Sequence, residues 1–428
     1  MNRSILWAVG AAFSIAVSAG AQEAPPKVDQ GRIDAAINKG VAYLKAQAGN
    51  LRKFEHVNRP MQEDELVLWT LVHASVPEND PVFQKLLKEM LERKLEATYC
   101  VALQAMILEE IQRVKYQWRI KQCAQFLVDN QCKNGQWTYG EPTIYAEETP
   151  SEADREDVST RVSREARRGG VVDFGGPGSR IKPEVKRRVR VEKKKDGPDS
   201  GDNSNTQYAA LGMRACHDAG IIIPESVTAR AIQWWRSSQK ESSGPRVRFD
   251  VKDSLDAPVT GGASGIMEVV NAEPQGWCYK DHGDHKAYGS MTAGAVGSLA
   301  IWLYIKDDDG GKKKRSWKKD KDVHEGLAWL AANFSVTYNP GPYEHGDRAE
   351  NSQHQFEYYL YALERAGMLY GTETMGTHWW YPEGAKVLLE KQAADGKWGG
   401  GVVDTCFAIL FLKRATAPLV PTGEAGRR

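Results

Sequence analysis

The sequence has almost no net charge and no long apolar run beyond its first residues. Its 57 Lys and Arg residues stand against 56 Asp and Glu residues, so no overall field favours nucleic acid or an anionic membrane. A membrane-spanning helix needs about 20 consecutive apolar residues, and no such run follows residue 17. We therefore expect no nucleic-acid partner, and no membrane span once the N-terminal segment is removed.

That N-terminal segment, residues 1–21, has the pattern of a secretory signal peptide. Arg3 supplies the positive start, residues 5–17 the apolar stretch, and Ala19-Gly20-Ala21 the small-residue cleavage site. We expect a mature chain that begins near Gln22 and is exported, either periplasmic or secreted. Anchoring by an uncleaved segment is the alternative.

Cysteine is scarce, with six residues in the chain. An oxidising compartment permits disulfides, but a large core does not need them. Most of these cysteines fall within helical runs, where a thiol behaves as a small hydrophobe. We interpret them as core residues rather than as a disulfide framework.

One turn element occurs twice, about 260 residues apart, which indicates an internal repeat. It reads Gln131-x3-Gly135-x-Trp137 and Gln392-x3-Gly396-x-Trp398, and each copy closes an apolar helical run. Weaker copies keep an aromatic residue four positions before an amide, which places both on one helix face. These weaker copies are Tyr43 with Gln47, Trp235 with Gln239, and Trp329 with Asn333.

A second repeated element consists of a threonine followed by small and apolar residues. It reads Thr98-Tyr-Cys-Val-Ala-Leu, Thr206-Gln-Tyr-Ala-Ala-Leu, Thr292-Ala-Gly-Ala-Val-Gly and Thr405-Cys-Phe-Ala-Ile-Leu. The threonine is typical of a helix N-cap. A helix that is apolar on all sides is buried, so each repeat is predicted to be an outer helix, a turn and an inner helix.

Counting these pairs gives six. The outer helices are predicted at 31–47, 81–94, 117–131, 226–239, 322–333 and 383–392. The inner helices are predicted at 63–76, 98–113, 205–219, 290–305, 353–367 and 404–415. Stacked helical pairs usually form an open solenoid, whereas six pairs with very apolar inner helices favour closure into a double barrel with a central cavity.

The Gln-x3-Gly-x-Trp elements resemble the QW repeats of squalene and oxidosqualene cyclases. Residues 27–415 resemble the terpenoid cyclase / protein prenyltransferase superfamily, and Asn203-Ser-Asn-Thr-Gln-Tyr, Gly289-Ser-Met-Thr-Ala-Gly and Asp404-Thr-Cys-Phe-Ala-Ile-Leu resemble a secreted bacterial branch of it. The resemblance implies an all-α fold, an (α/α)6 toroid of six helical hairpins. It does not carry a function.

Residues 141–202 interrupt the repeat. They are rich in charge, glycine and proline and have no sustained helical period, so a disordered insertion is expected. Its basic half, residues 182–195, is either a solvated loop or a binding segment for an acidic partner. The last residues, 416–428, are expected to form a flexible tail.

Chemistry is expected where the inner helices begin, because parallel helices gather their N-termini at one mouth of a cavity. The residues predicted to line this ligand cavity are Asp64, Glu65, Tyr99, Asn205, His354, Glu357, Tyr358 and Tyr359. An unknown ligand in the central cavity is the partner that this arrangement predicts.

Two groups of residues are candidates for metal binding or catalysis. Asp404-x-Cys406 resembles the Asp-x-Cys pair that holds zinc in protein prenyltransferase β subunits, although the third ligand of that family, a histidine on the next inner helix, is missing. A helix cap beside a packed thiol is the alternative. His282 and His285, with Asp281 and Asp284, are suited to zinc, iron or manganese, and either histidine could act as a general base.

The catalytic motifs of the resembled enzymes are absent from the predicted helices. Neither the Asp-x-Asp-Asp motif of squalene cyclases nor the Asp-Asp-x-x-Asp motif of diphosphate lyases stands there. Two functions stay open. The first is an exported binding or scaffold protein without standard cyclase activity. The second is an extracytoplasmic enzyme acting on an isoprenoid or polysaccharide at the cavity mouth, metal-dependent if His282, His285, Asp404 and Cys406 bind an ion.

Overall fold

Helices make up most of the protein in the computed structural model. The model describes residues 26–55, 60–142, 182, 185–252, 267–280, 285–308, 315–342, 353 and 355–419. Within these residues the chain forms twelve α-helices and four short two-stranded sheets. The predicted all-α class is therefore right in its main feature, and none of these helices is long and apolar enough to cross a membrane.

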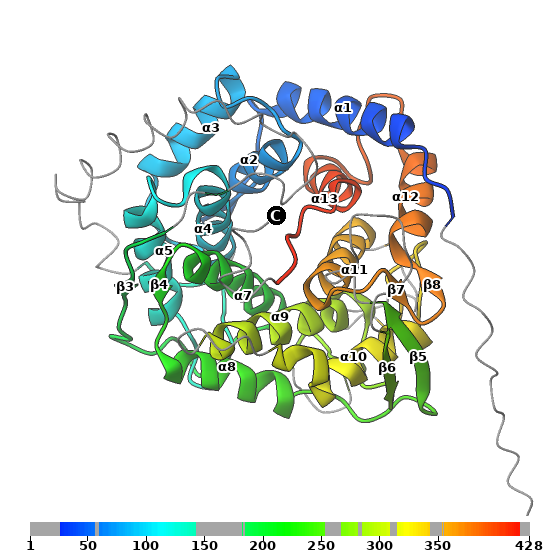
Figure 1. Ribbon diagram of the computed structural model, residues 1–428. Helices are drawn as coiled ribbons and strands as arrows, with labels where there is room; N and C mark the ends of the chain where they lie inside the picture. Colours follow the sequence, from blue (N-terminus) through cyan, green and yellow to red (C-terminus); the bar gives the residue numbers. More distant parts are fainter. Residues whose placement is uncertain are drawn as a thin grey trace, which may run out of the picture.

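The twelve helices alternate between two layers (Figure 1). The outer helices are α1 (Gln30–Gln47), α3 (Pro81–Glu92), α5 (Gln117–Asp129), α8 (Glu225–Ser237), α10 (Lys321–Ala332) and α12 (Trp380–Lys391). The inner helices are α2 (Asp64–His73), α4 (Thr98–Gln112), α7 (Asn203–Asp218), α9 (Gly289–Asp307), α11 (Phe356–Tyr370) and α13 (Val402–Lys413). All twelve lie within a few residues of their predicted positions.

Composition explains which helix lies in which layer. In α3 the fully buried residues are Phe83, Leu86 and Met90, a single stripe at helical spacing. Every residue of α2 is buried, as is nearly all of α9. A helix with one apolar stripe covers a core, whereas a helix that is apolar all round lies within it.

The inner helices pack in chain order. Each one contacts the next along the chain, and α13 also contacts α2, so the last inner helix lies beside the first. In Figure 1 they surround a common centre, with the outer helices outside them.

The two QW elements join neighbouring outer helices through the same hydrogen bonds. Gln131 Nε2 donates to the Val227 carbonyl of α8 at 2.9 Å, and Gln392 Nε2 donates to the Ala36 carbonyl of α1 at 2.8 Å. The glutamine that ends one outer helix thus binds the next outer helix. The indole of Trp137 donates back to its own outer helix, at the Leu127 carbonyl, at 2.7 Å.

The sequence predicts that the threonines of the second element are N-caps, but in the structure they lie inside their helices. The N-cap of α7 is Asp202, which accepts from the Asn205 amide. Thr206 Oγ1 instead donates to the Asp202 carbonyl at 2.6 Å and accepts the Trp137 amide at 3.0 Å. Thr405 accepts the Trp398 amide in the same way, at 3.0 Å. In α7 and α13 the threonine therefore joins the inner helix to the QW turn that precedes it.

A third copy of this turn is split by a hairpin. Gln239 Nε2 donates to the Asp322 carbonyl of α10 at 3.0 Å, but the matching tryptophan is Trp277. Its indole donates to the Trp235 carbonyl at 2.7 Å, and its amide donates to Thr292 at 3.1 Å. Between them stand the antiparallel strands β5 (Val247–Lys252) and β6 (Met267–Ala272). The sequence did not predict this hairpin.

Three smaller sheets also went unpredicted. They pair β1 (Lys53–Glu55) with β2 (Pro60–Gln62), β3 (Val189–Arg190) with β4 (Ile221–Ile222), and β7 (Thr374–Met375) with β8 (His378–Trp379). Each strand is two or three residues long, too short for a period-2 pattern to be recognised in the sequence.

Residues 185–202, the last part of the expected insertion, are ordered, which corrects the prediction of disorder for them. Lys193 Nζ donates to the Val128 carbonyl at 2.8 Å, and the Lys194 amide donates to Asp129 at 2.8 Å, so this segment covers the C-terminal end of α5. Lys182 pairs with Glu109 at 2.7 Å. Lys182 and Lys193, two lysines of the basic half that was either a solvated loop or a binding segment, thus contact other parts of the chain. Residues 143–181 lie outside the described residues.

The start of the predicted flexible tail is also ordered. The Thr416 amide and hydroxyl donate to the Glu364 carboxylate of α11 at 2.9 and 2.7 Å. Arg214 of α7 donates to the carbonyls of Ala417 and Pro418 at 2.6 and 2.9 Å. Residues 415–419 therefore bridge two inner helices that are not neighbours, and in Figure 1 this red segment crosses the middle of the inner layer.

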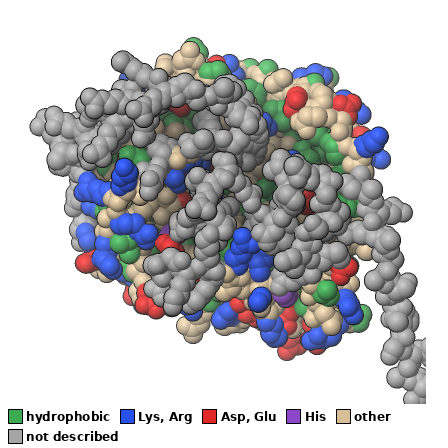
Figure 2. Space-filling view, viewed as in Figure 1, with side chains coloured by type: hydrophobic (Ala, Val, Ile, Leu, Met, Phe, Trp, Pro, Cys, Tyr) green, Lys and Arg blue, Asp and Glu red, His purple; other side chains and the backbone are tan. Residues whose placement is uncertain are grey.

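All six cysteines are buried and free of disulfides, in agreement with their prediction as core residues. On the face shown in Figure 2, basic and acidic side chains intermingle among the coloured atoms, as the nearly balanced composition leads one to expect.

Candidate functional site

Side chains from inner helices that are not neighbours meet at the centre of the inner layer. The Trp69 indole of α2 donates to the Tyr361 hydroxyl of α11 at 3.2 Å, although α13 packs between these two helices. Arg365 Nη2 of α11 donates to Gln207 Oε1 of α7 at 2.7 Å, although α9 packs between them. Because these contacts skip a helix, the four side chains must project towards the inside of the layer.

Further aromatic rings join these four residues. Tyr99 and Tyr208 lie 4.3 Å apart between ring centroids. Phe407 of α13 lies 5.3 Å from Tyr358 and 5.8 Å from Tyr361. We call this group the interior cluster, and its members are Trp69, Tyr99, Gln207, Tyr208, Tyr358, Tyr361, Arg365 and Phe407.

Residues on the same helix faces as the interior cluster keep a small exposed fraction of their surface. Leu66 precedes Trp69 by three positions, Met106 follows Tyr99 by seven and Leu211 follows Tyr208 by three, so each shares a face with its aromatic neighbour. They retain 8%, 7% and 6% of their surface. Val101 and Ala209, on other faces of α4 and α7, retain none. The interior cluster therefore lies beside side chains that are not completely buried.

Arg365 is the one cation of the interior cluster and is 2% exposed. Its guanidinium lies over the rings of Tyr361 and Tyr208, at 4.3 and 5.6 Å from their centroids. Among the described residues no ion pair joins it to a carboxylate, and its Nη1 has no hydrogen-bond partner. Burial raises the pKa of Tyr208 well above its ordinary value, and the charge of Arg365 opposes that rise.

Of the predicted cavity residues, Asp64 and Glu65 share one basic partner, Arg93. Arg93 binds Asp64 at 2.5 Å and Glu65 at 2.9 Å, and Gln104 also donates to Glu65 at 3.4 Å. Burial raises the pKa of Glu65, while Arg93 opposes the rise. Arg93 therefore forms a buried salt bridge with one oxygen of each acid at the start of α2, and Glu65 Oε2 has no hydrogen-bond partner among the described residues.

Asp404 and Cys406 do not acquire the neighbours that a zinc site needs. Asp404 Oδ2 accepts the Gly400 amide at 2.6 Å, which fixes the turn before α13. Cys406 is fully buried, and burial raises the pKa of its thiol to about 12. Within the described part of the chain, no group of three or more His, Cys, Asp or Glu residues could hold a metal.

Glu357 is the predicted cavity residue with the strongest acid–base character. It lies in the first turn of α11 and is largely buried. Burial, and next the charge of Asp404, raise the pKa of Glu357 to about 7. A carboxylic acid with that pKa can donate or accept a proton near neutral pH.

The remaining predicted residues separate into three cases. Tyr99 and Tyr358 belong to the interior cluster. Tyr359 does not, because consecutive helix residues point about 100° apart, and its hydroxyl donates to the Ser335 carbonyl at 3.0 Å, away from the interior. Asn205 is buried and donates to Asp202 at 2.9 Å, where it supports the start of α7.

The predicted histidine site falls largely outside the described residues. His282 and His354 lie there, as do Asp281 and Asp284. His285 is described and half-buried before α9.

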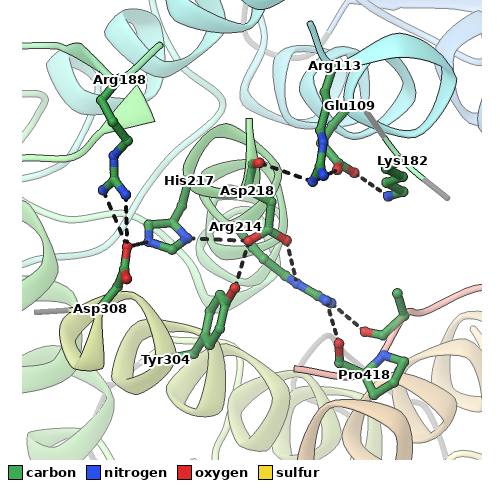
Figure 3. A network of polar contacts seen from close by, with 11 residues as sticks. Glu109, Arg113, Lys182, Arg188, Arg214, His217, Asp218, Tyr304, Asp308 and Pro418 are labelled. Atoms are coloured by element: carbon green, nitrogen blue, oxygen red, sulfur yellow. Dashed lines mark hydrogen bonds and ion pairs between the residues drawn. The ribbon is translucent and has the colours of Figure 1, made fainter. Parts of the chain in front are cut away.

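A second polar group lies where the inner helices end (Figure 3). His217 binds Asp308 at 2.9 Å and Asp218 at 3.3 Å. Asp218 also accepts from the Tyr304 hydroxyl at 2.9 Å and pairs with Arg214 at 3.4 Å. These acids and bases neutralise one another, so we assign them to holding the helix ends together rather than to chemistry.

Sequence reasoning missed the members of the interior cluster that carry its polarity. Gln207 and Tyr208 stand inside the quoted Thr206 element but were interpreted only as helix residues. Arg365 follows Tyr358 by seven positions and Tyr361 by four, which places all three on one face of a buried helix. A single arginine on the face of an otherwise apolar inner helix was the sequence signal that could have identified this polar site.

Comparison with known proteins adds no identification to this geometry. No protein-family model matches the chain, and no curated protein matches it.

Proposed function

We propose that this protein is an exported α/α toroid of the terpenoid cyclase / protein prenyltransferase superfamily that binds a ligand inside its inner helices. The two QW elements and their shared hydrogen bonds support the superfamily assignment. The order of helix contacts, with α13 beside α2, supports the (α/α)6 arrangement. The signal-like residues 1–21 support export.

The interior cluster carries the proposal that the protein binds a ligand. A wall of aromatic rings offers large apolar surface with a few polar groups, which is the usual composition of a small-molecule site. Partial exposure of Leu66, Met106 and Leu211 supports a space beside that wall. The ordered segment 415–419 lies across the interior between α7 and α11, so the ligand would enter from the end where the inner helices begin.

Binding without catalysis is favoured by the state of the acidic residues. Arg93 occupies Asp64 and Glu65, and a turn amide occupies Asp404. These contacts hold one oxygen of each carboxylate, which supports a structural role for all three.

An enzyme is the second candidate, and Glu357 supports it. An acid with a pKa of about 7 beside Asp404 resembles the paired carboxylates of glycan-cleaving enzymes. Such an enzyme would act at the entrance and would lose activity in a Glu357→Gln variant.

A neutral fluorescent probe tests the binding proposal. We expect N-phenyl-1-naphthylamine to gain fluorescence with the folded protein, and Leu211→Trp, which fills the interior, to weaken its binding by about tenfold or more. Leu211→Phe provides a milder variant if the larger side chain disrupts folding. Tyr381→Phe, on the outer helix α12, is the matched control and should bind as the unmodified protein does. Unchanged binding by both Leu211 variants, or no binding at all, would overturn the proposal.

A further inference from the structure

We propose that the ligand is an organic anion, with its acidic head held by Arg365 and Gln207 and its apolar body against the aromatic rings of the interior cluster. This inference rests on the proposed function, since it names the chemical class of the ligand for the same site.

Arg365 first requires a compensating charge. A buried cation is costly unless it is paired, yet among the described residues no carboxylate forms an ion pair with this guanidinium. The adjacent acid, Glu364, attracts the guanidinium, but its two oxygens accept hydrogen bonds from the amide and hydroxyl of Thr416 rather than from Arg365. The rings of Tyr361 and Tyr208 attract the cation, but they do not neutralise it.

Gln207 adds a second donor beside the first. Its Oε1 accepts Arg365 Nη2, and this bond fixes the orientation of the amide, so Nε2 must be the free end. Neither Gln207 Nε2 nor Arg365 Nη1 has a hydrogen-bond partner among the described residues, and both atoms are buried. Two adjacent donors without an acceptor suit an oxygen atom that carries negative charge.

The surroundings determine the rest of the ligand. Tyr358, Tyr361 and Phe407 present ring surface on one side, and Leu211 and Met106 present aliphatic surface on other inner helices. A small inorganic ion would leave this apolar surface without a partner. A carboxylate or phosphate head on an apolar chain satisfies both the donors and the rings.

Three matched probes separate charge from apolar contact, namely dodecanoate, dodecyl phosphate and dodecanol, each measured by displacement of N-phenyl-1-naphthylamine from the full chain. We expect at least one of the two anions to bind about tenfold or more tightly than dodecanol, because a buried charge-assisted hydrogen bond replaces an orphan donor. The tighter of the two anions identifies the head group as a carboxylate or a phosphate.

Two substitutions assign that preference to the named residues. Arg365→Gln removes the cation, and Gln207→Glu places a carboxylate beside it, so both variants should lose the preference for anions while keeping dodecanol binding. Arg414→Gln is the matched control, because Arg414 also lies over a tyrosine ring, 4.6 Å from the centroid of Tyr381, but is exposed. Gln207→Glu keeps the test decisive if Arg365→Gln fails to fold.

The outcomes distinguish the two proposals. If dodecanol binds as tightly as both anions, or the preference survives in Gln207→Glu, the anion inference is wrong and the binding site stands. If none of the four compounds binds, the proposed function itself fails.

Discussion

His217 gives the protein a stability that depends on pH. Its imidazole is almost fully buried and lies between Asp308, at 2.9 Å, and Asp218, at 3.3 Å. Burial alone would favour the neutral ring, but the hydrogen bonds and charges of these two carboxylates outweigh it and raise the pKa of His217 from 6.5 to about 9. Asp218 keeps its charge over the same range, since its pKa is lowered to about 2.

The sign and size of the effect follow from this shift. The imidazolium contributes its full stabilisation below pH 6.5, where the unfolded chain is also protonated, and loses it as pH rises through about 9. Between those values only the folded state holds the proton, so the free energy of unfolding falls by up to about 1.4 kcal/mol per pH unit. The total loss is roughly 3 kcal/mol, as an order of magnitude. Arg188 and Arg214 also face these carboxylates.

Urea unfolding followed by circular dichroism measures this loss. The protein should become less stable between about pH 6.5 and pH 9, and His217→Gln should reduce that slope while lowering stability near neutral pH. His378→Gln, which removes an exposed histidine beside Glu383, is the matched control and should leave the slope unchanged. If His217→Gln and the unmodified protein show the same dependence on pH, His217 does not hold its proton in the way argued.

Two further predictions concern the QW turns and use the same unfolding assay. Gly135→Ala should destabilise by about 3 kcal/mol or more, because Gly135 has φ of +98° and a Cβ there would lie 2.3 Å from the Arg230 carbonyl oxygen. Gly49→Ala is its control, since a Cβ at Gly49 meets nothing within 4 Å, and equal effects of the two variants would refute the steric argument. Gln131→Leu should cost about 2 kcal/mol by leaving the Val227 carbonyl without its donor. A cost near zero would mean that this bond between outer helices does not hold the repeat together.

The helices were predictable because their signal is local and repeated. An aromatic residue four positions before an amide marks the end of an outer helix, as at Trp235 and Gln239, and an all-apolar run marks an inner one. Each pattern depends on helical periodicity, which folding preserves. For that reason the predicted bounds and the assignment to two layers agree with the structure even where one QW copy has decayed.

Contacts between distant residues were not predictable in the same way. Trp277 completes the turn that starts at Gln239, but the β5–β6 hairpin separates them, so no fixed spacing marks the pair. Threonine is a common N-cap residue, yet Asp202, four positions before Thr206, is the N-cap of α7. The ion pair between Arg93 and Glu65 forms because the α3–α4 connection brings Arg93 to the start of α2. The sequence pattern does not specify the path of that connection.

The small residues of α9 combine a local sequence pattern with a contact between distant residues. Gly294 lies in the run of small and apolar residues that predicts a buried inner helix, and a Cβ there would lie 2.3 Å from Gln207 Oε1. The absence of that Cβ is what lets the Gln207 side chain lie against α9. Arg365, on the far side of α9, reaches the same amide. A larger residue at position 294 would displace Gln207 and separate it from Arg365. The glycine that is interpreted from sequence as a packing feature is therefore also the reason that two buried donors from α7 and α11 come together.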